Sequence, residues 1–278
     1  MNPTASGYTL LFSMAFPGAE ELGRSLKKYY NNYNIEFLNI EDLHFKDFYP
    51  EKSFIFCDRD SSLKKARQTG MPVIAVSHSC NREESLFGSP FMIVLEEAAS
   101  AVDILTPMYL EKVYCRHHLL PLQIARTPRL ILRELTMSDL NDVISLDLEN
   151  ISDSDALFFP PEYLSSRFRD LHCETFLKNY IRNQYRFFDI GFYGVFEKEH
   201  GQFAGLVGFN TPEDRYIEIG YSLKEKFRRR GIGTEALSAL LGYFRTYYPS
   251  LDVIVTMKEP NTASRKLAEK FGIRCIIH

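Results

Sequence analysis

The chain has 278 residues and a formal net charge of −3, and its length exceeds the ~100–200 residues of an ordinary domain, so two domains are predicted. Nucleic-acid-binding chains usually have a clear basic excess, which is absent here, and no apolar run approaches the ~18–20 residues that span a bilayer. The five cysteines form no CxxC pair, so neither structural zinc nor a disulfide framework is expected. The composition therefore predicts a cytoplasmic globular protein without a nucleic-acid or membrane partner.

Residues 1–122 alternate short apolar stretches with polar or amphipathic ones. Strands are predicted at Tyr8–Met14, Ile35–Ile40, Ser53–Cys57, Pro72–Ser77 and Phe91–Leu95. Helices are predicted at Gly18–Tyr30 and Asp60–Thr69, the second ended by Gly70. Apolar strands that alternate with helices are typical of a parallel sheet covered on both faces. We therefore expect a small, doubly wound, Rossmann-like α/β domain with its sites at the carboxyl ends of the strands.

A closing helix or linker follows at Thr106–Leu120, bounded by Pro107 and Pro121. It contains the pair His117–His118, which resembles a metal-binding pair at first sight. Adjacent residues on a helix point ~100° apart, so these two side chains are not expected to share one metal ion.

A second pattern begins at Arg126 and continues to the end of the chain. A strand is predicted over 126–135 and a helix over Asp139–Leu148. The polar, aromatic-rich segment Ile151–Arg186 is expected to contain a helix at Arg169–Asn183, with an apolar face of Leu171, Phe176, Leu177, Tyr180 and Ile181. Further strands are predicted at Gly191–Glu197, Gln202–Phe209 and Arg215–Leu223, the first two joined as a hairpin through Gly201.

A basic turn with two glycines joins the strand that ends at Leu223 to an amphipathic helix at Thr234–Tyr247. Its sequence is Arg228-Arg-Arg-Gly-Ile-Gly233. Glycines let the backbone approach a ligand closely, and the first N–H groups of a helix attract anions. The turn matches neither GxxxxGK[ST] nor GxGxxG, which argues against an NTPase or a dinucleotide-binding site. The residues thus favour a pyrophosphate cradle, with a solvated basic turn as the alternative.

The order of elements resembles the GNAT acyltransferase superfamily over residues 123–278. Arg228, Gly231 and Gly233 match the R/Q-x-x-G-x-G/A pattern with which that family holds the CoA pyrophosphate. The segments 127–133 and 218–223 are similar to the subgroup of ribosomal-protein and peptide N-terminal acetyltransferases. After a predicted strand at 252–257, residues 261–272 resemble the family's N-x-x-S-x-x-L-x-E-K-x-G segment. The resemblance implies an α+β GNAT domain after the Rossmann-like one.

This resemblance implies that an N-acetyltransferase moves the acetyl group of acetyl-CoA directly to an amine in a ternary complex, without a metal. Cofactor contacts are expected at Tyr221, Ser222, Leu223, Arg228, Arg229, Arg230, Gly231, Ile232, Gly233, Thr234, Asn261 and Ser264. Glu218 is the candidate general base, with a solvent-facing strand residue as the alternative, and Ser264 is the candidate partner of the departing sulfur. The acceptor is expected to be a small-molecule or peptide amine, because the charges in 151–186 favour neither a cationic nor an anionic substrate.

Two departures from the family pattern bear on activity. Ala268 stands where many members have a tyrosine, which leaves the general acid open. After Gly272 the sequence has one predicted strand where the family has more, so the chain is truncated, or the N-terminal domain or another subunit, as in a homodimer, completes the acceptor wall. Both departures keep a second hypothesis open, a catalytically weak or inactive acyl-CoA-binding sensor or scaffold.

The N-terminal domain carries Asp58 at the carboxyl end of a predicted strand. The run from Asp60 to Val76 resembles the later part of haloacid-dehalogenase-type phosphatases and is also compatible with a receiver-like domain. Both need acidic residues after the first strand, where this chain has Ser13-Met-Ala-Phe-Pro, and a receiver needs lysine where Glu96 stands. We therefore expect a degenerate, non-catalytic domain in which Asp58 is a helix-capping or turn residue.

Overall fold

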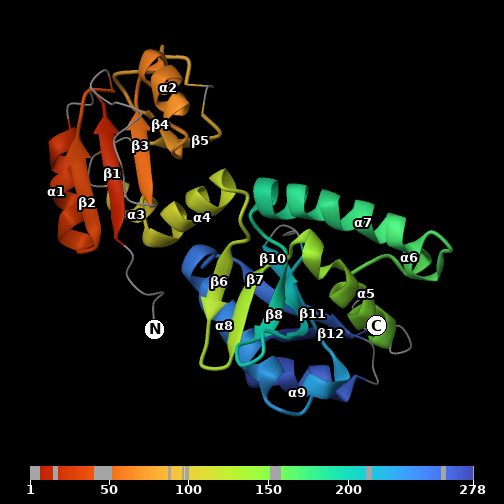
Figure 1. Ribbon diagram of the computed structural model, residues 1–278. Coiled ribbons are helices and arrows are strands. Elements are labelled where there is room, and N and C mark those ends of the chain that lie inside the picture. The colour runs from red at the N-terminus through yellow and green to blue at the C-terminus, as the bar shows by residue number, and fades with distance from the viewer. Residues whose placement is uncertain are drawn as a thin grey trace. The chain divides into compact units, whose positions relative to one another are not determined.

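The computed structural model describes residues 7–14, 18–40, 52–86, 89–95, 97, 100–150, 158–210, 215–257 and 261–277. The chain divides into two compact units, residues 2–120 and 121–278 (Figure 1). In the described part of the chain, no helix has both the length and the apolar character needed to cross a membrane.

The N-terminal unit is built on a parallel five-stranded sheet with strand order β2-β1-β3-β4-β5. The strands are β1 Tyr8–Ser13, β2 Tyr33–Phe37, β3 Ser53–Cys57, β4 Val73–Ser77 and β5 Phe91–Val94. The helices are α1 Ala19–Tyr29, α2 Asp60–Ala66, the short η2 Arg67–Thr69, α3 Ala101–Ile104 and α4 Pro107–His117 (Figure 1). This strand order is one of the two common orders of doubly wound sheets.

Helices cover both faces of the central strands, which is why β1 and β3 are buried at every position. Leu10 and Phe12 of β1 pack in one core cluster with residues of α1 and α4. Leu11, between them, packs in a second cluster with Leu63 of α2. The edge strand β2 instead alternates buried and exposed residues over most of its length, and it begins two positions before the predicted Ile35.

The C-terminal unit contains a mixed seven-stranded sheet with strand order β12-β11-β10-β9-β8-β7-β6. The strands are β6 Gln123–Arg126, β7 Leu130–Glu134, β8 Phe192–Glu197, β9 Phe203–Phe209, β10 Tyr216–Leu223, β11 Asp252–Met257 and β12 Arg274–Ile277. The α-helices are α5 Leu140–Asn150, α6 Pro161–Ser165, α7 Arg169–Tyr180, α8 Ile232–Tyr247 and α9 Thr262–Lys270. The other helical segments are η4 Met137–Asp139, the π-helical η5 Ile181–Phe188 and η6 Glu225–Phe227.

Strand direction changes at β10. Neighbouring strands from β6 to β10 are antiparallel, whereas β10, β11 and β12 run parallel. The β10–β11 pairing covers Tyr216–Glu218 alone, and Ile219–Leu223 pair with β9 but with no residue of β11. The two parallel strands therefore separate after Glu218 and leave a gap in the sheet. At the far edge, no strand of the described residues pairs with the outer side of β12.

Two sequence predictions in this unit are wrong in detail. The strand predicted over 126–135 is a hairpin of β6 and β7, because Pro128 cannot donate to a strand ladder and Thr127 Oγ1 accepts from Leu130 N in the turn. In the helix predicted at Arg169–Asn183, Leu171 is 61% exposed. The buried residues Cys173 and Leu177 define the inner face, and Leu171 lies ~200° around the helix from Cys173.

Candidate functional site

The turn between β10 and α8 has an unusual backbone. Arg229 and Gly231 have φ values of 57° and 76°, both in the left-handed region. Gly231 precedes α8 without a side-chain cap, and the first bond of the helix runs from Glu235 N to Gly231 O at 3.1 Å. The N–H groups of residues 232–234 therefore precede the helical hydrogen bonds and can serve a ligand. The positive end of the helix dipole adds to the attraction for an anion at the same place.

The three arginines of this turn are not equivalent. Arg228 Nε donates to Leu223 O at 3.0 Å, and Arg228 Nη2 donates to Asn150 Oδ1 on α5. The guanidinium of Arg230 lies over the Phe227 ring, 5.7 Å from its centroid. Arg229 is exposed, and among the described residues its guanidinium forms no hydrogen bond or ion pair. Arg229 is thus the arginine best placed to meet an incoming anion.

Three contacts tie the start of this turn to α5. Lys224 Nζ lies 2.7 Å from Asp142 Oδ1, and Glu225 N donates to Glu149 Oε2 at 3.2 Å. The Arg228–Asn150 hydrogen bond is the third contact, and Asn150 is buried with 4% exposure. These contacts, which we name the α5 clip, hold the turn against the helix that leads into residues 151–157, outside the described part of the chain.

A cavity of about 540 Å³ opens beside the turn. It is lined by Thr127, Pro128, Arg129, Gly231, Thr234, Glu235, Ser238, Ala239 and Lys270. Burial opposes ionisation of Glu235, but hydrogen bonds from Thr127 and Arg129 outweigh it and lower the pKa of that carboxyl. Arg129 Nη2 lies 2.6 Å from Glu235 Oε2, so the charge of Arg129 is neutralised by this ion pair. Lys270 is exposed and forms no ion pair with another described residue, so it leaves the cavity a free positive charge.

The residues of β10 that are predicted to contact the cofactor lie beside the gap between β10 and β11. Backbone groups alternate along a strand, and the hydrogen bond from Asn210 N to Glu218 O directs the even-numbered residues of β10 to β9. The N–H and C=O of Tyr221 consequently face the gap, whereas those of Ser222 face β9. Glu218 is the last residue that pairs with β11, and its Oε2 accepts from Asn210 Nδ2 at 2.7 Å.

The N-terminal turn of α9 lies against the same strand. Asn261 caps the helix, with its Oδ1 accepting from Ser264 N at 2.9 Å. The Tyr221 hydroxyl donates to Ser264 O at 2.9 Å, and the Ser264 hydroxyl forms no hydrogen bond within the described residues. The structure therefore brings together three residues from two predicted motifs. Ala268, at the family's tyrosine position, is fully buried.

In the N-terminal unit, Asp58 does not cap a helix, which was one of the two roles predicted for it. Helix α2 begins at Asp60 without a side-chain cap. Asp58 is instead 2% exposed, and its Oδ2 lies 3.2 Å from His78 Nε2. Asn81 Nδ2 donates to the Asp58 carbonyl at 2.8 Å. No sequence pattern indicated His78 and Asn81, which Asp58 meets because the carboxyl ends of neighbouring parallel strands share one edge.

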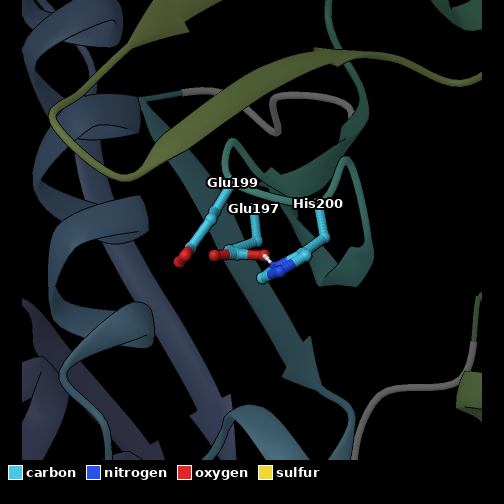
Figure 2. Close-up of side chains that lie close together, drawn as sticks. All are labelled: Glu197, Glu199 and His200. Carbon is cyan, nitrogen blue, oxygen red and sulfur yellow. Dashed lines mark hydrogen bonds and ion pairs between the residues drawn. The ribbon is translucent and has the colours of Figure 1, made fainter.

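Among the described residues, one group of side chains could hold a metal ion, and no sequence motif indicated it. Glu197, Glu199 and His200 lie on the β8–β9 hairpin with their ligand atoms within 4.8 Å of one another (Figure 2). None of the three lines the cavity beside the turn.

The model of the acetyltransferase (GNAT) domain family matches residues 129–274. The chain belongs to the GNAT acetyltransferase family. The match spans strand β7, the turn before α8, the gap after Glu218 and helix α9, so these features belong to an acetyltransferase domain.

Several solved structures are similar to this chain. RimL, a ribosomal L7/L12 alpha-N-protein acetyltransferase in complex with coenzyme A, has 23% identity and a TM-score of 0.45, covering 54% of this chain and 82% of its own. An acetyltransferase (GNAT family) from Bacillus anthracis has 24% identity and a TM-score of 0.42, with the same coverage of 54% and 82%. A putative ribosomal-protein-serine acetyltransferase from Vibrio cholerae has 22% identity and a TM-score of 0.41, again with 54% and 82%. The family assignment rests on the family model.

Proposed function

We propose that this GNAT domain transfers the acetyl group of acetyl-CoA directly to the amine of an acceptor while both are bound. The observation that carries the proposal is the left-handed turn at Arg229–Gly231, with uncapped N–H groups of α8, at the end of a strand that has parted from its neighbour. An uncapped helix start suits a pyrophosphate, and a strand edge that faces a gap offers backbone hydrogen bonds to the amides of a pantetheine arm. The two features are continuous along the chain.

Each part of the cofactor would have its own partners. The N–H groups of Ile232, Gly233 and Thr234 and the guanidinium of Arg229 bind the pyrophosphate, while Arg228 and Arg230 hold the turn in place. The pantetheine arm follows the backbone of Tyr221 and Leu223 toward Ser264. The nucleotide end extends into the cavity beside the turn, where Lys270 offers a positive charge.

The transfer forms a C–N bond and breaks the C–S bond of the thioester. The amine loses a proton to Glu218 through a water molecule, its nitrogen attacks the acetyl carbon, and CoA leaves as a thiolate that takes up a proton. The buried Ala268 has no proton to donate to the departing sulfur. The Ser264 hydroxyl, which has no hydrogen-bond partner among the described residues, therefore stabilises the sulfur. A backbone N–H in the gap would stabilise the oxyanion.

The proposed acceptor is a small-molecule or peptide amine, and the proposed compartment is the cytoplasm. The names of the RimL and Vibrio cholerae structures refer to ribosomal-protein substrates, which makes protein N-termini a sensible first class to screen. A second candidate function is favoured by Ala268. Without a proton donor at that position the domain would bind acyl-CoA as a sensor and turn it over slowly or not at all.

Calorimetric titration of acetyl-CoA into the full chain tests the binding step. We expect micromolar affinity that falls ~10-fold or more in Arg229→Ala, since a hydrogen bond to a charged group contributes ~1.5–3 kcal/mol. Arg245→Ala, an exposed arginine in the last turn of α8, is the matched control and should bind like the intact protein. Absence of binding by the intact protein would end both hypotheses. Binding without CoA release across a panel of peptide and small amines would favour the sensor.

A further inference from the structure

We propose that Glu197, Glu199 and His200 form a site for a borderline divalent metal ion of the Zn²⁺ class on the β8–β9 hairpin. The site supplies one imidazole nitrogen and two carboxylates, which distinguishes it from a purely acidic surface cluster. The proposal is independent of the proposed acetyl transfer, because none of these residues is assigned a role in it.

The hairpin presents the three side chains on a short, closed turn. Glu197 N donates to Gln202 O at 2.8 Å, and Gly201 takes a φ of 66° that lets the chain reverse. All three side chains converge below the turn, with the imidazole of His200 facing the carboxylate of Glu197 (Figure 2). Three ligands therefore come from four consecutive residues, the last residue of β8 and the turn that follows it.

The separation of the donors suits a metal ion. His200 Nδ1 lies 3.3 Å from Glu197 Oε2. Ligand atoms placed ~2.1 Å from a tetrahedral Zn²⁺ are ~3.4 Å apart, so these two atoms already stand at the spacing that one ion requires. The donor atoms of all three residues lie within 4.8 Å of one another, and Glu199 is exposed and can close the remaining distance by changing rotamer.

The charge around the hairpin leaves the two carboxylates available. Lys198 lies between them in the sequence, but its Nζ donates to Thr127 O at 3.1 Å and to Pro128 O at 3.2 Å. In the described part of the chain, no lysine or arginine pairs with Glu197 or Glu199. The Glu197 side chain is 14% exposed, so its negative charge is partly shielded from water and attracts a cation more strongly.

The ligand types select the class of ion. Ca²⁺ and Mg²⁺ prefer oxygen ligands alone, whereas an imidazole nitrogen with carboxylates suits Zn²⁺, Co²⁺ and Ni²⁺. Three protein ligands leave a fourth position for water. The competing explanation is an ordinary ion pair between His200 and Glu197, and that explanation gives Glu199 no part.

The test is calorimetric titration of Zn²⁺ into the full chain after removal of metals with a chelator. We expect saturable micromolar binding that weakens ~10-fold or more in both Glu199→Gln and His200→Ala. His118→Ala, which removes another exposed histidine, should leave the affinity unchanged. Co²⁺ provides a second readout, because its visible absorption band on the intact protein should be lost in the two site variants.

Absence of saturable Zn²⁺ binding by the intact chain would overturn the proposal. Equal binding by the intact chain and by Glu199→Gln would do the same, since the carboxylate would then not be a ligand. Circular dichroism of each variant would confirm that its fold is retained. Loss of affinity in Glu199→Gln with an unchanged spectrum would support the site and exclude the ion-pair explanation.

Discussion

The α5 clip makes a specific prediction for Asn150, a residue that lies outside the motif matched to the CoA pyrophosphate. Its Oδ1 accepts from Arg228 Nη2, and its own Nδ2 donates to Leu146 O at 2.6 Å. In Asn150→Ala the turn loses the Arg228–Asn150 hydrogen bond, one of its three contacts with α5. A hydrogen bond from a charged donor contributes ~1.5–3 kcal/mol, and we expect the lower end because the exposed Arg228 can turn to water.

If the clip holds the turn in its binding geometry, ~1.4 kcal/mol of this loss should appear in cofactor binding as a ~10-fold rise in the Kd for acetyl-CoA. Calorimetric titration measures the Kd, and urea unfolding measures the accompanying loss of stability. Asn150→Asp, which keeps an oxygen acceptor at the same place, is the matched control and should bind nearly as tightly as the intact protein.

A positioning role for Asn150 would be contradicted if Asn150→Ala bound acetyl-CoA as tightly as the intact protein while Arg229→Ala bound it weakly. The turn would then hold its geometry without the Arg228–Asn150 hydrogen bond. If Asn150→Ala and Asn150→Asp lost affinity equally, the cause would be the lost Leu146 contact and not the clip.

The remaining predictions concern stability, chemistry and backbone strain. Burial raises the pKa of Asp147 from 3.8 to about 6, although backbone hydrogen bonds from Phe159 and Phe158 act to lower it. The folded chain therefore holds the carboxyl proton more tightly than the unfolded chain does. This difference in pKa contributes about 3 kcal/mol to the free energy of unfolding below pH ~4, and the contribution is lost as the pH rises through ~6. In Asp147→Asn, urea unfolding at several pH values should no longer show this loss. Glu218→Gln should lower kcat by ~10²–10⁴ with an unchanged Kd for acetyl-CoA, and an unchanged kcat would exclude Glu218 as the base. Gly231→Ala, at a φ of 76°, should lower the free energy of unfolding by ~1–2 kcal/mol, whereas Gly242→Ala, exposed inside α8, should raise it by up to ~1 kcal/mol.

Much of the fold follows from local rules that a sequence displays directly. Apolar strands alternating with helices predicted the parallel sheet of the N-terminal unit, and its five strands lie close to the predicted ranges. The run from Glu218 through Gly233 predicted a strand, a turn and a helix start, and the structure has β10, a left-handed turn and α8 in that order. These features depend on periodicity and on glycine, which act within a few residues along the chain.

The functional differences between neighbouring residues required the tertiary structure. Arg228 and Arg229 are equivalent in the sequence, yet one is held by a residue 78 positions away and the other stays exposed. Asp58 likewise meets His78 across adjacent strands, and Tyr221 meets Ser264 on a helix 43 positions later. Hydrophobic pattern determines which face of an element is buried, but the partner of a polar side chain depends on which elements pack beside it. That choice is made by the packing of the whole domain, so the sequence alone predicted the motifs and the structure decided their contacts.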